Sequence, residues 1–158
     1  MEMVFNEKIV NAGELKHVEG KVELYWIYTS GEAGDRFFKV LKNEGKFLAA
    51  KCTCCGKTYF PPRIYCEYDF SETEFVEISG EGCVRAFAVA TLDNNEEALE
   101  NPEIYAIIDM DGTDGCIIHL LGEVDAEEVC VGMKVKPVLK PKEEREGRIT
   151  DILYFKPA

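Results

Sequence analysis

The spacing of a few cysteines in the first half of the chain constrains its fold more than any other feature. Cys52 and Cys55 are separated by two residues and followed by Gly56, and Cys66 comes shortly afterwards. Two thiolates at this spacing can bind one metal ion, and the glycine lets the backbone turn so that its amides face sulfur. A second Cys-x-x-Cys pair is expected next, but Asp69 stands at its last position. The pattern predicts a zinc ribbon with a structural metal.

The fourth ligand is open at this stage. A carboxylate oxygen binds zinc at about 2.0–2.2 Å and a thiolate at about 2.3 Å, so Asp69 is chemically acceptable. Cys54 is the alternative, although its spacing fits the turn less well. A third reading is a ribbon without metal, held together by Tyr59, Phe60, Ile64 and Tyr65. A catalytic zinc is disfavoured because such sites usually carry histidine, and neither His17 nor His119 is near in sequence.

The segment before the cysteines predicts one helix, over about residues 31–43. Ser30 is expected to cap its start, and Gly45 is expected to end it. Phe47 then opens a predicted strand that runs to Lys51 and leads into the cysteines.

Two apolar groups in this first segment are candidates for docking a partner protein. One is the stripe of Phe37, Phe38 and Leu41 on the predicted helix, and the other is Tyr25-Trp26 within residues 22–28, a predicted short strand or docking segment. An exposed aromatic stripe favours a protein interface. Packed against the ribbon, the helical stripe would be core instead.

From residue 73 the pattern is all β. Short β-rich runs alternate with Gly, Asn, Asp and Pro, and an acidic loop is expected over 93–103. The runs cover residues 73–79, 83–92, 104–111, 115–124, 133–139 and 148–155. Five or six strands in such a length fit a small closed barrel, of which the OB-fold is the common form.

Charge and composition exclude several classes of protein. Residues 67–129 contain 18 acidic side chains and one basic side chain, Arg85, so a nucleic-acid ligand would be repelled. The charged start of the chain lacks the apolar core of a signal peptide, and the seven cysteines are an odd number, so a cytoplasmic protein without disulfides is expected. Cys83, Cys116 and Cys130 lie in apolar runs and are predicted to be buried.

These features together resemble the DUF35 family of acyl-CoA-associated proteins. The match covers about residues 22–157, and Asp69 departs from the usual family pattern. The residues that carry it are Cys52-x-x-Cys55-Gly56, Pro61-Pro62-Arg63 and Cys66, with residues 28–38 similar to the family's helix entry and residues 132–138 and 149–157 similar to its last barrel strands.

The resemblance implies a mainly β fold with an N-terminal helix, a rubredoxin-like zinc ribbon and a small OB-fold barrel. We expect an N-terminal helical docking segment over residues 1–46, a zinc ribbon over 47–72 and an OB-fold domain over 73–158. The cofactor it implies is a structural zinc held by Cys52, Cys55, Cys66 and Asp69.

The resemblance also implies a non-catalytic subunit of a thiolase-type acyl-CoA complex. Family members assemble with thiolases or thiolase-like condensing enzymes, and some with acyl-CoA hydratases or aldolases. Residues 30–38 are most similar to the thiolase-associated branch, which includes the small subunit of benzoylsuccinyl-CoA thiolase in anaerobic toluene degradation. The chemistry is then expected on the partner chain, because neither histidine here has a nucleophile and an oxyanion hole evident beside it.

Contacts to coenzyme A or to the partner are expected at Arg63, Lys134 and Lys136, although each also reads as an ordinary solvated side chain. A coenzyme A thioester shared with the partner is the implied second ligand. Two other functions stay open: a stand-alone acyl-CoA binder, and a nucleic-acid-binding OB module, against which the acidic middle of the chain argues.

Overall fold

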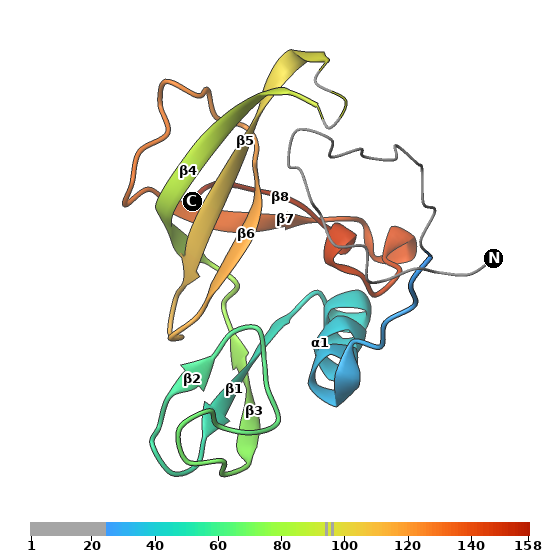
Figure 1. The fold of residues 1–158 in the computed structure, drawn as a ribbon, viewed down its shortest axis with the longest axis vertical. Coiled ribbons are helices and arrows are strands. Elements are labelled where there is room, and N and C mark those ends of the chain that lie inside the picture. The colour runs from blue at the N-terminus through green and yellow to red at the C-terminus, as the bar shows by residue number, and fades with distance from the viewer. Residues whose placement is uncertain (1–24, 94, 96) are drawn as a thin grey trace, which may run out of the picture.

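Two small β modules, one α-helix and two short 3-10 helices make up the described part of the chain. The computed structural model describes residues 25–93, 95 and 97–158. A small sheet lies at one end of the molecule, a barrel lies at the other, and the helix packs beside both (Figure 1). His17, residues 22–24 and most of the expected segment 1–46 lie outside the described residues.

Helix α1 spans Gly31–Glu44 and confirms the predicted helix. It ends as expected, because Gly45 adopts φ 72° and its N–H donates to the carbonyl of Leu41 at 3.0 Å. Its start differs from the expectation. The Ser30 side chain makes no capping hydrogen bond, and Thr29 Oγ1 instead accepts from the Gly31 N–H at 3.2 Å. Residues 25–30 form no strand, which corrects the strand alternative for that stretch.

The ribbon sheet has three antiparallel strands in the order β2-β1-β3. They are β1 (Phe47–Cys52), β2 (Thr58–Tyr59) and β3 (Thr73–Ile78). Strand β3 pairs with β1 along its whole length, from Phe47↔Ile78 to Cys52↔Thr73. The run at residues 73–79 was expected in the barrel, and it belongs to the ribbon instead. The expected boundary after residue 72 therefore falls inside the ribbon sheet.

The second module is a closed five-stranded barrel with the order β4-β5-β6-β8-β7. Its strands are β4 (Gly82–Leu92), β5 (Ala98–Met110), β6 (Cys116–Leu121), β7 (Lys134–Leu139) and β8 (Ile152–Pro157). Two details differ from the sequence prediction. Residues 98–103 extend β5 instead of completing an acidic loop, and residues 149–151 form a 3-10 turn before β8.

One hydrophobic core runs from α1 through the ribbon into the barrel. Phe37 packs edge-on against Phe47 and Phe60, with ring centroids 6.1 and 5.7 Å apart. Leu41 is fully buried, and Phe38 packs against the same cluster. The cluster continues into the barrel through Val84, Ile104, Ala106, Ile108, Met110, Ile117, Leu121, Val129, Val135, Ile152 and Phe155. The stripe of Phe37, Phe38 and Leu41 is therefore core and not an exposed docking surface.

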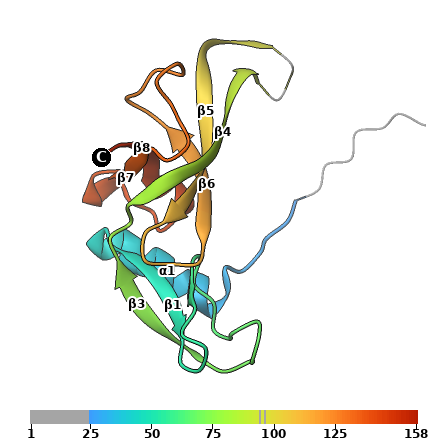
Figure 2. The same ribbon diagram turned by 90° about the vertical axis from the view of Figure 1, so that its left-hand side faces the viewer.

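The β5–β6 turn joins the two modules directly. The Thr58 N–H donates to Asp114 Oδ2 at 2.9 Å, and the Asp114 N–H donates to the Thr58 carbonyl at 2.7 Å. A Cβ atom added at Gly115 would overlap the backbone of Phe60, so only glycine allows this approach. These contacts fix the ribbon against the barrel. Figure 2 shows the turn between β5 and β6 reaching the ribbon sheet.

The connection between β7 and β8 folds around one buried carboxylate. Asp151 has no exposed surface, and its two oxygens accept the N–H groups of residues 146, 147 and 148 at 2.7–3.2 Å. Burial raises the pKa of Asp151, but these three donors together outweigh it and hold the pKa below its ordinary value.

Among the described residues, no helix combines the length and apolarity that crossing a bilayer requires.

Candidate metal centre

Two turns of the same construction face each other in the ribbon. In the first, the Cys52 N–H donates to the carbonyl of Lys57 at 2.8 Å, and in the second the Cys66 N–H donates to the carbonyl of Ser71 at 2.9 Å. Both bonds span the same number of residues. Gly56 follows the first pair of ligands with φ 76°, and Phe70 follows the second with φ 56°. The second turn therefore repeats the first, although a phenylalanine stands where the first has glycine.

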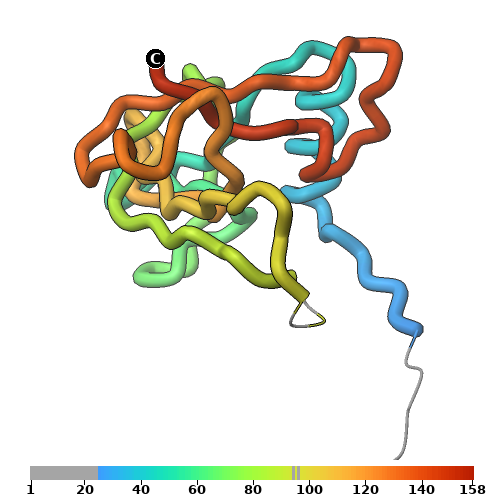
Figure 3. The backbone as a smooth tube through the Cα atoms, turned by 90° about the horizontal axis from the view of Figure 1, so that it is seen from above, coloured from blue at the N-terminus to red at the C-terminus, as the bar shows by residue number. Residues whose placement is uncertain are grey.

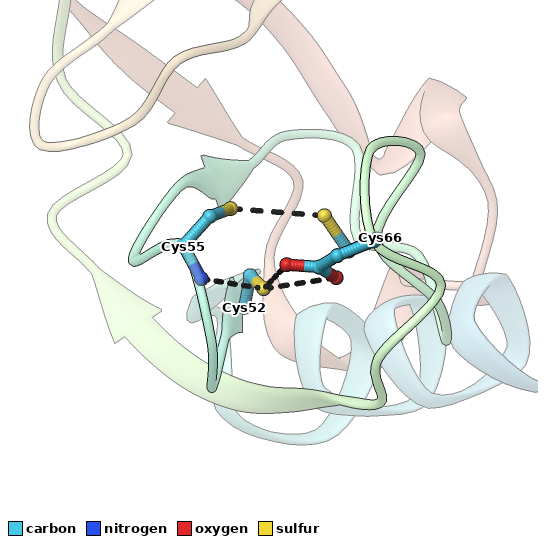
Figure 4. A group of neighbouring side chains, drawn as sticks. Cys52, Cys55 and Cys66 are labelled. Carbon is cyan, nitrogen blue, oxygen red and sulfur yellow. Dashed lines mark hydrogen bonds between the residues drawn. The ribbon is translucent and has the colours of Figure 1, made fainter.

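Four donor atoms gather between these turns. One ligand atom from each of Cys52, Cys55, Cys66 and Asp69 lies within 4.8 Å of the others. Cys55 Sγ is 3.7 Å from Cys66 Sγ, and Cys52 Sγ is 3.6 Å from Asp69 Oδ2 (Figure 4). A tetrahedron around zinc with ordinary bond lengths has sulfur–sulfur edges of about 3.8 Å and sulfur–oxygen edges of about 3.6 Å. The spacing of the donors therefore fits a four-coordinate zinc ion.

Asp69 is oriented by its neighbour Ser71. Its Oδ1 accepts the Ser71 hydroxyl at 2.6 Å and the Ser71 N–H at 3.0 Å. These bonds hold the pKa of Asp69 well below its usual range and leave Oδ2 free to bind a cation. Cys54 is exposed and stands outside the group of four, so Asp69 is the better placed fourth ligand among the described residues.

Cys52 and Cys66 have hydrogen-bond donors beside their sulfur atoms. Cys52 Sγ lies 3.1 Å from the Ser71 hydroxyl and accepts the N–H groups of Cys54 and Cys55 at 3.3 and 3.2 Å. The Ser71 hydroxyl is the main reason that the pKa of Cys52 falls to about 7. Tyr59 places its hydroxyl 3.1 Å from Cys66 Sγ, and this contact raises the Tyr59 pKa. The phenol therefore stays protonated and can donate to a Cys66 thiolate. At Cys55 the Lys57 N–H lowers the pKa, but burial and the neighbouring thiols outweigh it and raise the pKa to about 11.

A fully occupied donor set has a chemical consequence. With three sulfur ligands and one oxygen ligand, a bound zinc has no open position for substrate, which is the arrangement of structural sites. The ion would link the two turns of the ribbon, and its binding free energy would stabilise the folded state. Cys52 and Cys66 are buried, whereas Cys55 and Asp69 are exposed, so the centre lies at the surface of the ribbon.

The expected contact residues are not brought to one site. Arg63 lies on the ribbon, where it pairs with Glu67 at 2.7 Å and stands over the ring of Tyr59. Lys134 and Lys136 lie on barrel strand β7, and Lys134 pairs with Asp111 at 2.9 Å. These three residues stay predictions as contacts to coenzyme A or to a partner.

The N-terminal aromatic residues are exposed. Tyr25 and Trp26 expose 87% and 65% of their surface, and Trp26 stacks on Tyr28 with ring centroids 6.2 Å apart. Residues 25–30 run from the start of α1 away from the body of the molecule (Figures 2 and 3). Their docking role stays a prediction.

Three cysteines outside the ribbon differ from the expectation of burial. Cys83 and Cys116 are half-buried and Cys130 is exposed. Cys83 and Cys116 both pair across strands with Asp109, so they lie on the outward face of the barrel and not in its core. His119 agrees with the expected core or interface position, because it is half-buried against Phe155 with ring centroids 5.7 Å apart.

Sequence reasoning missed the residues that support the ligands. Ser71 orients Asp69, and Tyr59 contacts Cys66, but neither was assigned to the metal centre. A signal existed for Phe70. It follows Asp69 as Gly56 follows Cys55, so the repeat of the turn could have indicated a left-handed residue there.

Comparison with known families and structures gives a consistent picture. The family model of the ChsH2 rubredoxin-like zinc ribbon domain matches residues 41–75, and that of the ChsH2 C-terminal OB-fold domain matches residues 75–140. The chain is 31% identical over 127 residues to a DUF35 domain-containing scaffold protein of Methanocaldococcus jannaschii, covering 77% of this chain and 89% of that protein. A scaffold protein of the same description from Methanothermobacter thermautotrophicus is 28% identical, with 77% and 94% covered.

Solved structures share the same architecture. A DUF35 family protein of unknown function from Sulfolobus solfataricus superposes with a TM-score of 0.64 at 28% identity, covering 81% of this chain and 87% of that one. The Ltp2-ChsH2(DUF35) aldolase superposes with a TM-score of 0.60 at 19% identity, covering 80% and 95%. At that identity the second likeness supports the fold alone.

Proposed function

The chain belongs to the DUF35 family, and on that premise we propose that it is a non-catalytic, zinc-stabilised subunit of a thiolase-type acyl-CoA complex. In this role the bond-breaking chemistry takes place on a partner enzyme. The present chain shapes or completes the partner's acyl-CoA site, and its ribbon is held by a structural zinc on Cys52, Cys55, Cys66 and Asp69.

The observation that carries this proposal is the single core shared by α1, the ribbon and the barrel. A subunit that positions other proteins needs surfaces held in a fixed relation to each other. Here the shared core and the Asp114–Thr58 hydrogen bonds supply that rigidity. The exposed Tyr25 and Trp26 then offer aromatic anchors of the type that concentrates binding energy at interfaces.

The names of the relatives support an assisting role. Two of them are described as scaffold proteins. We favour a thiolase-type partner because residues 30–38 have the form of the thiolase-associated branch. Benzoylsuccinyl-CoA in anaerobic toluene degradation is the substrate that this branch suggests, and a cytoplasmic location follows from it. A partner of the aldolase class is the alternative, favoured by the description of the structural neighbour as an aldolase.

Co-expression tests the proposal. The chain and the thiolase-type enzyme encoded beside it are expected to co-elute as a stable hetero-oligomer, and full acyl-CoA turnover is expected only from the complex. Failure of the two chains to co-purify would contradict the thiolase assignment. Full turnover by this chain alone would contradict the non-catalytic role. Running an aldolase-type enzyme in parallel identifies the alternative partner.

Two cheaper measurements separate the other functions. Calorimetry with coenzyme A on the isolated chain is expected to give weak binding, and tight binding would favour a stand-alone acyl-CoA carrier. A gel shift with single-stranded DNA or RNA at low salt is expected to give no complex, since residues 67–129 carry 18 acidic side chains against one basic side chain.

A further inference from the structure

An apolar surface covers the outside of the barrel where β5 and β6 run together. In antiparallel strands, directly paired residues point to the same side of the sheet. The register places Ile107 beside Ile118 and Tyr105 beside Leu120. On β4, the positions opposite Ile107 and Tyr105 are Ala86 and Ala88. Two adjacent rows of apolar side chains therefore face outward across three strands.

A shallow groove of about 400 Å³ extends this surface toward β8. Its walls are Tyr105, Ile118 and Leu120 on one side and Ile149 and Leu153 on the other. The groove exists because β6 pairs with β8 only at Leu121↔Phe155, so the rest of β6 stands apart from the segment that precedes and begins β8. The surface and the groove share Tyr105 and Ile118, and together they are called the barrel face below.

The barrel face is exposed beyond what isolated surface residues would explain. Ile118 exposes 66% of its surface, and Tyr105, Ile149 and Leu153 expose 41–42% each. With roughly 200 Å² for a fully exposed large residue, these four alone amount to roughly 400 Å² of surface. A contiguous apolar patch of that size matches the largest patch of a typical soluble monomer, and such patches are often functional.

Acidic residues bound the two apolar rows at both ends. Beyond Tyr105 the next outward position on β5 is Glu103, whose carboxylate accepts the Tyr105 hydroxyl at 2.8 Å. Beyond Ile107 the next is Asp109, which pairs with Arg85 at 3.2 Å. Arg85 is the one basic residue in the sequence between positions 67 and 129.

We propose that the barrel face, formed by the outward side of β5 and β6 and the groove beside β8, is the docking site for the partner enzyme. This inference rests on the proposed function. The occupant it requires is a protein surface with an apolar centre flanked by Lys or Arg, which complements apolar rows that end in acids. A second copy of this chain carries the same net charge of −12, and the one basic residue between positions 67 and 129, Arg85, is already paired with Asp109. Nucleic acid, which OB-folds often bind on the corresponding strands, would meet the same repulsion.

A matched pair of variants tests the docking site. Ile118→Asp places a charge at the centre of the barrel face, and Val131→Asp places the same charge on an apolar residue that is 67% exposed outside it. Binding to the purified thiolase-type enzyme of the co-expression experiment is measured by biolayer interferometry. We expect Ile118→Asp to weaken binding at least tenfold and Val131→Asp to change it less than twofold. Ile118→Thr, which keeps a β-branched residue in β6, is expected to weaken it by a smaller factor, and thermal unfolding checks that each variant is folded.

Photo-crosslinking gives a readout that does not depend on stability. A benzophenone amino acid at position 118 is expected to crosslink to the partner enzyme, and one at position 131 is not. In addition, Glu103→Lys is expected to slow association and to flatten its dependence on salt.

The possible results separate this inference from the function it rests on. Wild-type chain that fails to bind the enzyme contradicts the proposed function itself. If the wild type binds, Ile118→Asp binds equally well and position 118 gives no crosslink, then the barrel face is not the docking site. If Tyr65→Asp weakens binding and Ile118→Asp does not, the interface lies on the ribbon, which also contradicts the proposal. Self-association of the isolated chain that Ile118→Asp abolishes would make a second copy the occupant, contrary to the proposal.

Discussion

Removal of the Asp69 carboxylate is the sharpest test of the metal centre. In the structure this side chain supplies the oxygen that lies 3.6 Å from Cys52 Sγ, and Ser71 holds it in place with two hydrogen bonds. Asp69→Ala leaves three thiols and their surrounding hydrogen-bond donors unchanged. The variant therefore removes one of four donors, and water can take the free position.

The size of the effect follows from the strength of structural zinc sites. Their apparent binding free energy is about 10–16 kcal/mol. One donor of four accounts for about 3 kcal/mol on that basis, and about 1.4 kcal/mol is a tenfold change in Kd, so zinc affinity should fall about 100-fold. At a fixed excess of zinc, a 100-fold weaker Kd removes about 2.7 kcal/mol of stability from the folded chain. For a chain of this length the loss corresponds to a Tm lower by about 5–10 °C.

Competition with a chelator that reports free zinc measures the affinity, and thermal unfolding with and without zinc measures the stability. Glu127→Ala is the control, because it removes one negative charge from an exposed position far along the chain. Asp69→Cys restores a fourth donor. In the cobalt-substituted protein this variant should raise the thiolate-to-metal absorption by about one third, since three sulfur ligands become four.

The reasoning fails if Asp69→Ala binds zinc as tightly as the wild type. In that case Cys54 or water would be the fourth ligand. It fails more broadly if the purified protein contains no metal and chelation leaves the Tm unchanged, because the ribbon would then be held by its aromatic side chains alone.

Three further substitutions test other parts of the structure. Phe70→Gly should raise the free energy of unfolding in urea by about 1 kcal/mol, because Phe70 holds a left-handed backbone conformation and 78% of its surface is exposed. A less stable variant would mean that the Phe70 ring contributes packing. Gly115→Ala should destabilise it by about 1–3 kcal/mol, because the added methyl overlaps the Phe60 backbone where the ribbon meets the barrel, and unchanged stability would refute that contact. Asp151→Asn should cost about 2 kcal/mol at pH 7, because the amide nitrogen cannot accept the N–H groups of residues 146–148. The folded pKa of Asp151 lies below its ordinary value, so the stabilisation by the carboxylate is present above about pH 4 and is lost as the pH falls through the folded pKa. The stability difference between Asp151→Asn and the wild type should therefore shrink in acid. A difference that does not change with pH would contradict the assignment.

The gathering of the four candidate ligands was predictable because its signal is local. Cys52, Cys55 and Cys66 are identified by spacing alone, and Asp69 by its place in the repeated turn. The supporting side chains were not predictable in the same way. Tyr59 meets Cys66 only after β1 and β2 fold back on each other, and the pattern carries no mark of that contact.

For the helix, the sequence predicted the position but not which side of it is buried. Its position and its end at Gly45 follow from local propensity, and both were predicted. Whether the stripe of Phe37, Phe38 and Leu41 faces solvent or core depends on what lies opposite, which periodicity does not state. The structure places Phe47 and Phe60 there.

The sequence by itself determined the elements whose causes are short in range: the ligand spacing, the helix and its glycine stop, most of the strands, and the acidic middle of the chain. Tertiary structure alone decided which strands pair and which apolar residues are left over. Strand β3 went to the ribbon because its register matches β1 over its full length, and Ile118 stayed exposed because β6 meets β8 at one position only. Pairing and burial depend on segments far apart in the chain, so no local pattern contains them.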